Sequence, residues 1–378
     1  MSEAAVEKQQ MEGRGISNSM VFDGLTLEYG GMLATNGHSL YKSRDVIMDC
    51  LDKIFADFEV TSQPLITVAD VGTSDGSTSL NLLNDIIDKI RVDSGQCREL
   101  MIYYTDLPGN NFNRMFSVLQ AGLHFGPDVF YAAVGRTMFE KCLPDNSTDL
   151  IFSSIAAMYL SKRPCQLKDG CYPRQENLEE MKAYHDQATL DWKTFLVMRG
   201  RELRRGGYLV VLNIGITKQG ETTIHLKGGF GTLGHVLKRM VADGLITEDE
   251  FLDCNTLFEL NRTEDDYALP FTENDKDLLE TGLELVSTRS FVNKLNHPSF
   301  EVADKDDATK TVYADRIVAG IKPWLYAIVY NGLSDRRSQR ERESLAEIYF
   351  SRLWDFAYQN DDQIPQLALV EIVAKKHA

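Results

Sequence analysis

The alternation of apolar and polar segments along the chain predicts its helices and strands. Five apolar runs rich in β-branched residues have the length and composition of buried strands. They are residues 65–71, 100–106, 149–154, 206–215 and 367–375. Apolar residues recur at helical spacing in residues 44–58, 77–90 and 188–207, and the last run ends in glycines typical of a helix stop. Because strands and helices alternate, we expect an α/β fold with a mostly parallel sheet and helices on both faces.

Two segments interrupt this alternation, residues 161–187 and 216–320. Both are rich in charged residues, glycines and helix-like patches such as HVLKRMVADGLITEDEFLDC. We expect them to form a mostly helical cap over the carboxyl ends of the strands, where α/β folds bind their ligands. The chain, residues 1–378, is then a single unit whose core comprises about residues 40–160, 188–215 and 321–378.

The charge balance argues against nucleic acid as a partner. The chain has 56 acidic and 40 basic residues, a formal net charge of −16. Such a surface repels nucleic acid unless a basic patch intervenes. The densest basic run, DRRSQRER at residues 335–342, alternates with acids and indicates a solvated helix face. No apolar stretch approaches the ~18 residues that a membrane span needs, so we expect no membrane partner either.

The cysteines and the first residues indicate a cytoplasmic protein. None of the six cysteines forms a C-x-x-C pair, and no histidine cluster accompanies them. This pattern predicts reduced thiols rather than a disulfide framework or a metal site. The first fifteen residues are polar and lack the apolar core of a secretory signal.

A glycine loop after the first predicted strand is the first candidate ligand site. In ITVADVGTSDG, residues 66–76, Gly72 and Gly76 would let the backbone approach a ligand closely. Their spacing fits neither the G-x-G-x-x-G pattern of dinucleotide folds nor the Lys-Ser/Thr end of a phosphate-binding loop. Asp70 would repel phosphate and suits a cationic ligand. Taken alone, the loop is explained equally well as a plain strand-to-helix turn.

An acid at the end of the second predicted strand favours the ligand-binding interpretation of the loop. Asp106 follows Gly76 by thirty residues and would stand beside the loop in a parallel sheet. An acid at that position is placed to accept hydrogen bonds from two ribose hydroxyls. The two acids and the loop together have the layout of an S-adenosylmethionine pocket. The alternative for Asp106 is a helix N-cap or turn residue, because Pro108 and Gly109 follow directly.

A second glycine pattern points to a different class of enzyme. GFGTLG, residues 229–234, matches G-x-G-x-x-G, the preceding TTIHL could be a strand, and Glu250 follows about twenty residues on. A nicotinamide oxidoreductase is therefore one alternative, which titration with NADH would reveal. We favour it less, because Glu250 falls inside the helical, charged ITEDEFL rather than at a strand end.

Several longer motifs resemble the SABATH family of carboxyl and N-methyltransferases. ADVGTSDGSTSLNLLNDII resembles the family's first loop and helix, and TDLPGNNFNRMF is similar to its NDLPGNDFNTIF. RTMFEKCLPDNSTDLIFSSIAAMYLS and GRELRRGGYLVVLNIG also match, from about residue 30 to the end, with residues 255–320 matched weakly. The resemblance implies a class I, Rossmann-like methyltransferase fold with seven strands, mostly parallel, under a helical cap. It also implies a homodimer, and low identity suggests a distant branch.

The resemblance assigns cofactor contacts position by position. Asp70, Gly72 and Thr73 would line the methionine end of S-adenosylmethionine, Asp106 would hold the ribose, and Leu107 would lie beside the adenine. Other cofactor contacts implied by the resemblance are Thr137, Met138, Ser153 and Ser39.

The acceptor side departs from the family pattern. Tyr159 stands where the family has a Trp that grips the substrate carboxylate, and Met158 replaces a His. In NGHSLYKSRD, residues 36–45, the family's carboxylate-binding Gln aligns with Ser43 or, after a one-residue slip, with Lys42. The resemblance also places Ile155 in the channel and Phe230 at the substrate-facing Trp of the cap.

These observations predict a methyltransferase that uses S-adenosylmethionine and acts on the carboxylate of a small acid. A carboxylate is ionised at neutral pH and needs no general base, so catalysis rests on alignment and exclusion of water. The missing Trp and Gln leave open N-methylation or hydroxyl O-methylation of a small heterocycle. A non-catalytic protein that binds S-adenosylmethionine is a further alternative.

Overall fold

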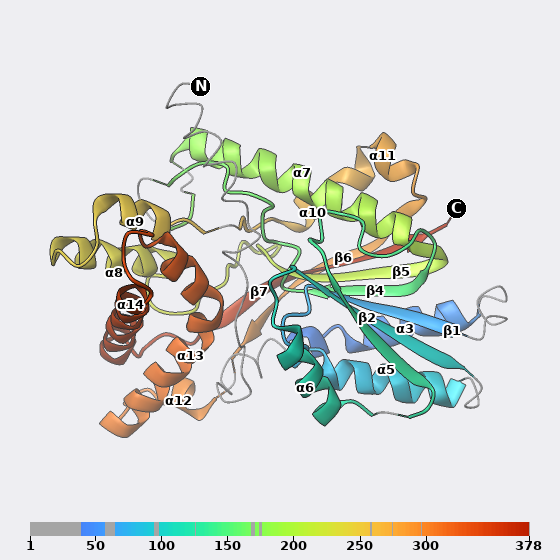
Figure 1. The fold of residues 1–378 in the computed structure, drawn as a ribbon, viewed down its shortest axis with the longest axis horizontal. Coiled ribbons are helices and arrows are strands. Elements are labelled where there is room, and N and C mark those ends of the chain that lie inside the picture. The colour runs from blue at the N-terminus through green and yellow to red at the C-terminus, as the bar shows by residue number, and fades with distance from the viewer. Residues whose placement is uncertain are drawn as a thin grey trace.

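The computed structural model describes residues 39–56, 65–93, 98–124, 126–167, 171–173, 176–257, 259–273, 275–295 and 297–377. Within these residues, seven strands form one sheet in the order β3-β2-β1-β4-β5-β7-β6 (Figure 1). The strands are β1 (Leu65–Val71), β2 (Glu99–Asp106), β3 (Val129–Gly135), β4 (Thr148–Ser154), β5 (Leu203–Ile214), β6 (Leu283–Lys294) and β7 (Gln366–Lys376). β7 pairs antiparallel with both of its neighbours, and the other pairings are parallel. The mostly parallel, seven-stranded sheet is confirmed.

The apolar pattern did not single out β3 and β6, the two edges of this sheet. Both strands leave many side chains partly exposed, so neither has the continuous apolar run of a strand buried on both faces. β6 lies inside residues 216–320, which we expected to belong to the cap. That expectation was wrong for this segment, because β6 pairs with β7 from Leu283 opposite Lys376 to Lys294 opposite Gln366.

Helices cover both faces of the sheet (Figure 1). One layer contains α3 (Arg44–Ala56), α5 (Leu80–Asp93) and α6 (Phe112–Gly122), and the other contains α7 (Leu178–Glu202), α10 (Glu264–Thr272) and α11 (Lys276–Leu279). The helix predicted at residues 188–207 begins earlier, inside the expected cap, and ends at Glu202. Residues 203–207 are already part of β5, where Gly206 has a φ of +82°.

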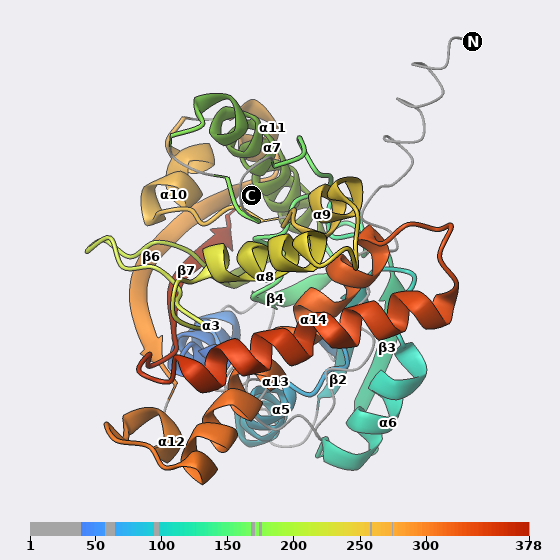
Figure 2. The same ribbon diagram turned by 90° about the vertical axis from the view of Figure 1, so that its left-hand side faces the viewer.

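A separate group of helices forms the cap. It contains α8 (Phe230–Ala242), α9 (Glu248–Cys254), α12 (Pro298–Glu301), α13 (Asp307–Gly332) and α14 (Gln339–Gln359). These helices lie at the carboxyl ends of the parallel strands, and Figure 2 shows α8, α13 and α14 crossing in front of the sheet. The expected cap over the strand ends is therefore present.

The boundary that we expected between cap and core at residue 320 is wrong. α13 passes through it without interruption, and its buried apolar side chains continue on the same helix from Ile317 to Ile321 and Leu325. These side chains share one apolar cluster with Tyr349 and Leu353 of α14. The continuous apolar face keeps both helices in the cap, and the chain returns to the sheet only at β7.

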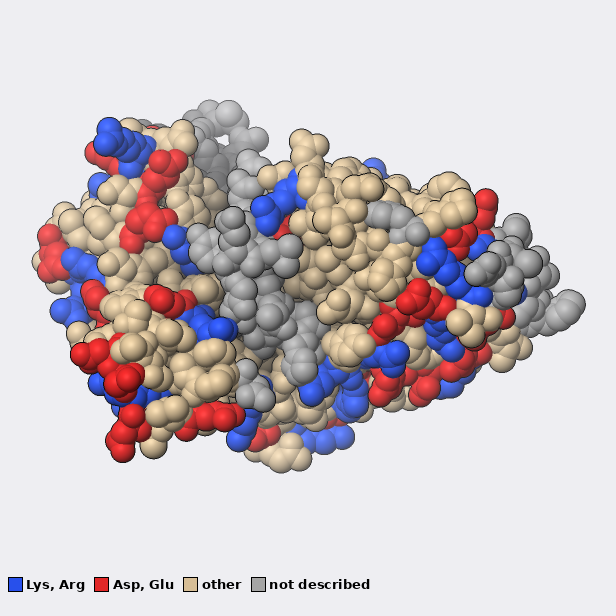
Figure 3. All heavy atoms as spheres, turned by 90° about the horizontal axis from the view of Figure 1, so that it is seen from below, with Lys and Arg blue, Asp and Glu red and all other residues tan. Residues whose placement is uncertain are grey.

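The basic run at residues 335–342 is used within the protein. Ser338 caps α14, and Arg337 pairs with Glu250 of α9 at 2.6 Å. Elsewhere, basic and acidic side chains are interspersed on the face seen from below (Figure 3). Pairs on α3 and α5, such as Lys89 with Asp52 at 2.5 Å, show the same mixing. No helix in the described ranges is long and apolar enough to cross a membrane.

Candidate active site

The glycine loop after β1 is fixed to β2 through its backbone. The N–H groups of Gly72 and Thr73 donate to the carbonyl of Thr105 at 2.8 and 3.2 Å. Gly72 has a φ of +81°, and a Cβ added there would lie 2.3 Å from the Cβ of Ala156. Both the backbone conformation and the available space therefore require glycine at this position.

Asp106 joins the end of β2 to this loop. Its Oδ2 accepts a hydrogen bond from the N–H of Ser74 at 2.6 Å, and its Oδ1 accepts one from the N–H of Leu107 at 2.7 Å. Burial raises the pKa of the Asp106 carboxyl, and the two backbone hydrogen bonds oppose that rise. Asp106 does not cap a helix, because Asn111 holds that position at the start of α6.

Asp70 lies beneath the loop. Its side chain is buried, and the Thr73 hydroxyl donates to its Oδ2 at 3.0 Å. Burial raises the pKa of Asp70 to about 6, although hydrogen bonds from the hydroxyls of Ser79 and Thr73 lower it in part. Neither Asp70 nor Thr73 lines the pocket described below. Both support the loop from below, and their direct contact with a cofactor stays a prediction.

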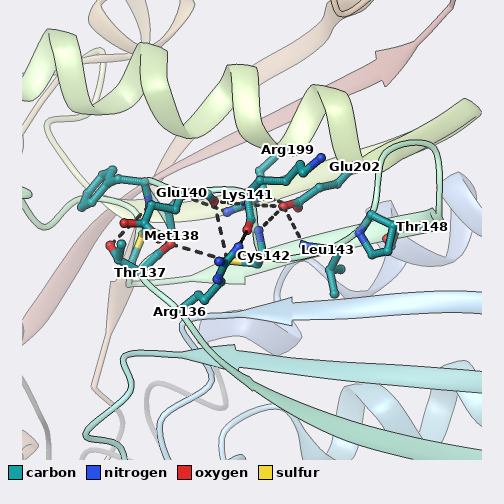
Figure 4. A network of polar contacts seen from close by, with 12 residues as sticks. Arg136, Thr137, Met138, Glu140, Lys141, Cys142, Leu143, Thr148, Arg199 and Glu202 are labelled. Carbon is teal, nitrogen blue, oxygen red and sulfur yellow. Dashed lines mark hydrogen bonds and ion pairs between the residues drawn. The ribbon is translucent and has the colours of Figure 1, made fainter.

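The segment between β3 and β4 carries Thr137 and Met138 and is anchored to helix α7 (Figure 4). The guanidinium of Arg199 donates to the carbonyl of Met138 at 2.9 Å and to that of Glu140 at 3.0 Å. An oxygen of Glu202 accepts hydrogen bonds from the N–H groups of Cys142 and Leu143 at 2.6 and 3.0 Å. These contacts fix the segment by its backbone.

Arg199 and Glu202 also bind each other, at 2.7 Å, and both side chains are fully buried. A buried ion pair is stable only when its remaining donors and acceptors are satisfied, and here the segment's backbone satisfies them. The sequence analysis did not identify this pair. Its available signal was an arginine and a glutamate three residues apart in RGRE, which also suits a solvated helix end.

The end of β4 contains a strained residue. Ile155 has a φ of +51°, which is unfavourable for a β-branched side chain, and its N–H donates to the carbonyl of Leu212 at 2.6 Å. The turn brings Ser154, Ile155 and Ala156 to the pocket wall. Ser153 instead donates to the carbonyl of Val71 at 2.8 Å and lies outside the lining.

One pocket connects these segments with the cap. Its sheet side is lined by Gly72, Ser74, Asp106, Leu107, Thr137 and Met138. Its cap side is lined by Ile155, Met158, Tyr159 and Leu160 from the segment after β4, and by His225, Glu259, Pro323 and Trp324 from the cap, among others. Eight of the residues that the sequence singled out are therefore brought together in one cavity: Gly72, Asp106, Leu107, Thr137, Met138, Ile155, Met158 and Tyr159.

The cap side contains three titratable groups with shifted pKa values. Burial, followed by the Glu259 carboxylate, raises the pKa of Tyr159 far above its usual range. Burial raises the pKa of Glu259 to about 7 and lowers the pKa of His225 to about 4. At neutral pH, Tyr159 is thus protonated and His225 is an uncharged imidazole. Sequence reasoning missed His225 and Glu259, which belong to irregular cap segments without a motif.

The predicted cofactor contact Ser39 and the predicted acceptor contacts Ser43, Lys42 and Phe230 lie outside the lining. The Ser39 hydroxyl accepts a hydrogen bond from Asn293 at 2.8 Å, Ser43 is buried, and Lys42 is exposed. Phe230 stacks on Tyr172, with ring centroids 5.2 Å apart, and meets the His225 ring edge-on at 6.0 Å. Phe230 therefore packs behind the pocket wall.

The second glycine pattern is a helix start. Gly229 is the N-cap of α8, and Gly231 and Gly234 lie inside that helix. Glu250 belongs to α9 and is paired with Arg337, which lowers the pKa of Glu250 to about 2. The arrangement of a dinucleotide-binding strand, turn and helix is not formed by these residues.

The strand order and the acid–glycine-loop–acid arrangement at the ends of β1 and β2 define a Rossmann-like methyltransferase that uses S-adenosylmethionine. The family model described as SAM dependent carboxyl methyltransferase matches residues 34–260, and the chain belongs to this family. The resemblance found in the motifs is confirmed.

The chain is similar to several characterised proteins. It is 28% identical over 243 residues to S-adenosyl-L-methionine:benzoic acid/salicylic acid carboxyl methyltransferase 2 of Petunia hybrida, covering 57% of this chain and 67% of that protein. It is 27% identical over 194 residues to salicylate carboxymethyltransferase of Clarkia breweri, covering 49% and 54%. The solved structure of loganic acid methyltransferase with SAH superposes with a TM-score of 0.71 at 20% identity, covering 94% of this chain and 98% of that chain. This structural likeness supports the fold.

Proposed function

We propose that this chain transfers the methyl group of S-adenosylmethionine to the carboxylate of a small organic acid. The observation that carries the proposal is the single pocket that joins Asp106 and the glycine loop to an apolar wall of the cap. S-adenosylmethionine supplies an activated methyl group on a sulfonium. A carboxylate oxygen forms the new bond to carbon as the carbon–sulfur bond breaks, and S-adenosylhomocysteine leaves as a neutral thioether.

The residues of the sheet side fit this cofactor. Each oxygen of Asp106 accepts one backbone hydrogen bond and retains a lone pair for a ribose hydroxyl. Leu107 and Met138 offer apolar contacts to an adenine ring. Gly72 lines the pocket without a side chain, so its backbone can approach the methionine end of the cofactor closely.

The protein's contribution to the reaction is alignment and exclusion of water. A carboxylate acceptor is already ionised at neutral pH, so no residue has to remove a proton from it. Pro323 and Trp324 of the cap, together with Leu160 after β4, cover the pocket with apolar surface. Holding the acceptor oxygen in line with the methyl carbon in a dry site supplies the rate enhancement.

Tyr159 is placed to hold the acceptor. The Tyr159 hydroxyl is protonated at neutral pH, and burial raises its pKa further, so it can donate a hydrogen bond to a carboxylate oxygen. Tyr159 would bind the substrate carboxylate in place of the Trp that the family has at this position. Met158 and Ile155 line the same wall and would pack against the apolar body of the acceptor.

A calorimetric titration tests the cofactor half of this proposal. We expect S-adenosylmethionine to bind the wild-type protein in a one-to-one complex. Absence of binding would refute a methyltransferase function altogether.

A second candidate is methylation of a nitrogen or hydroxyl of a small heterocycle. It is favoured by one observation, that neither Lys42 nor Ser43 lines the pocket, although they match the family's second carboxylate donor. The products separate the two candidates, because a methyl ester is hydrolysed in base and an N-methyl group is not.

We further propose that the protein acts as a cytoplasmic homodimer. The family resemblance supports the dimer, and the unpaired Cys50, Cys142, Cys165, Cys171 and Cys254 suit a reducing compartment. Light scattering should give twice the chain mass of 42.7 kDa, and a tagged chain should distribute through the cytoplasm. A monomeric mass would refute the dimer.

A further inference from the structure

Glu259 is an acid in the acceptor end of the pocket. It follows α9 in the cap, and its backbone forms an isolated antiparallel bridge with Tyr159 at the end of the sheet. The Glu259 residue is 4% exposed, yet it belongs to the pocket wall together with Met158, His225 and Trp324. Its carboxyl group is therefore shielded from bulk water but accessible to a molecule in the cavity.

Within the described residues, the Glu259 side chain makes no hydrogen bond or ion pair. Burial is the cause of its shifted pKa, and no donor opposes that shift. The other buried acids in the described residues are paired with a base or, like Asp70, Asp75 and Asp191, accept hydrogen bonds. The pairs with a base include Asp149 with Arg204, Glu202 with Arg199, Glu250 with Arg337, Glu264 with Lys218, and Glu371 with Arg289. Glu259 differs from these acids in lining a cavity instead of meeting a partner.

A buried carboxyl group without a partner is unfavourable for folding, because its charged form loses hydration and gains nothing in exchange. Such groups are concentrated at functional sites, where a ligand supplies the missing partner. The described lining of the pocket offers no cationic partner. None of the described residues that line it is Lys or Arg, and His225 is uncharged at neutral pH.

The charge of the pocket constrains the acceptor. A simple carboxylate would bring a further negative charge into a cavity whose wall already contains the carboxyl groups of Asp106 and Glu259. An acceptor that also carries an ammonium group has no net charge, and its ammonium can pair with Glu259 while its carboxylate faces the cofactor end. The aromatic ring of Trp324 in the same wall is also favourable for a cation.

We propose that Glu259 determines substrate specificity by pairing with an amino group of the acceptor, so that the natural substrate class is a small amino-bearing carboxylic acid with an apolar body. This inference rests on the proposed carboxyl methylation. The amine is the recognition group, and the carboxylate at the other end receives the methyl group.

Matched ligands test this inference by binding, without turnover. The protein is saturated with S-adenosylhomocysteine and titrated in a calorimeter with 4-(aminomethyl)benzoate, 4-(hydroxymethyl)benzoate and 4-ethylbenzoate. A second series compares ω-amino acids of increasing length with the matching alkanoates. We expect the best amino acid to bind about tenfold or more tightly than its alkyl analogue, because a site built for a polar partner rejects analogues that lack it.

Variants assign the preference to Glu259. Glu259→Gln keeps the shape and removes the charge, and it should lower the preference for the amine about tenfold, while Glu259→Leu should favour the alkyl analogue. Glu280→Gln, on an exposed turn after α11, is the matched control and should behave as wild type. Thermal unfolding of each variant confirms that the comparison is made on folded protein.

The outcomes separate this inference from the proposed function. Equal affinity for the amino and alkyl series, a preference for the hydroxyl analogue, no binding of any amino acid in the series, or an unchanged preference in Glu259→Gln would each overturn the role of Glu259. Amine-dependent binding without methyl ester formation in the presence of S-adenosylmethionine would support the role of Glu259 and refute carboxyl methylation.

Discussion

The carboxylate of Asp106 and the backbone N–H of Ser74 are joined by a 2.6 Å hydrogen bond that locks the glycine loop of β1 to the end of β2. The amide of Asn110 reinforces this link by donating to the carbonyl of Ser74 at 2.7 Å. That Asp106 oxygen retains a second lone pair, and Asp106 lines the pocket. The same carboxylate thus holds the loop and is the group that we propose binds the ribose.

Replacing Asp106 should weaken binding of S-adenosylmethionine. Asp106→Ala removes a charged acceptor for the ribose hydroxyls and frees the loop, so we expect the calorimetric Kd to rise about 10- to 100-fold. Asp45→Ala, at a side chain that is 91% exposed on α3, is the control and should leave the Kd unchanged. An unaltered Kd in Asp106→Ala would contradict the assignment of the ribose site.

Replacing Gly72 should distinguish a steric requirement from a conformational one. Gly72→Ala brings a Cβ to 2.3 Å from that of Ala156, whereas Gly220→Ala meets nothing within 4 Å at a similar φ of +78°. We expect Gly220→Ala to cost about 1 kcal/mol of unfolding free energy and Gly72→Ala to cost clearly more. Denaturant titration measures both losses.

A second substitution should relieve the steric clash that Gly72→Ala creates. The double variant Gly72→Ala with Ala156→Gly removes the atom that the new Cβ would meet, so its unfolding free energy should approach that of Gly220→Ala, apart from the effect of Ala156→Gly alone. A double variant no more stable than Gly72→Ala would show that the close approach to Ala156 is unimportant.

Breaking the buried pair on α7 should destabilise both the fold and the site. Arg199→Met leaves Glu202 buried without its partner, a change that typically costs about 3–5 kcal/mol. Because Arg199 also binds the carbonyl of Met138, the remaining folded protein should bind S-adenosylmethionine more weakly. Arg201→Met, exposed on the same helix, is the control. Similar unfolding curves for the two variants would refute this role.

The stability of the protein should depend on pH through Glu259. The Glu259 carboxyl has a pKa of about 7 in the folded protein and an ordinary pKa of 4.5 in the unfolded chain. Between pH 4.5 and pH 7, the folded state therefore keeps a proton that the unfolded state has lost. Its contribution is fully present below pH 4.5 and is lost as the pH rises through 7. Relative to Glu259→Gln, the wild type should lose on the order of 3 kcal/mol over that window.

This pH dependence is measured as the difference between the two unfolding free energies. Asp70 and His225 titrate in neighbouring ranges, but both are present in wild type and variant, so their contributions cancel in the difference. A difference that does not vary with pH would contradict the shifted pKa of Glu259.

The parts that the sequence could predict are those with local signatures. Gly72 and Asp106 were identified because each stands at the end of an apolar run that predicts a strand. The parallel sheet followed from apolar runs buried on both faces. The edge strands β3 and β6 were not predicted, because strands that are half exposed lack a continuous apolar run.

The acceptor end of the site depends on contacts between distant segments. Glu259, His225 and Trp324 come from three parts of the cap that meet only after α13 has packed across the strand ends. Nothing near Glu259 in the sequence signals a cavity. Lys42 illustrates the reverse case. A local motif match placed it at the acceptor, but the side chain is exposed in the fold.

The most direct test of the central claim is the chemical fate of a labelled methyl group. The wild-type protein is incubated with S-adenosylmethionine labelled in its methyl group and with a panel of small carboxylic acids that includes amino acids. We predict a labelled methyl ester that releases its label as methanol in base. Label found only in base-stable products, or no transfer by a protein that binds S-adenosylmethionine, would contradict carboxyl methylation.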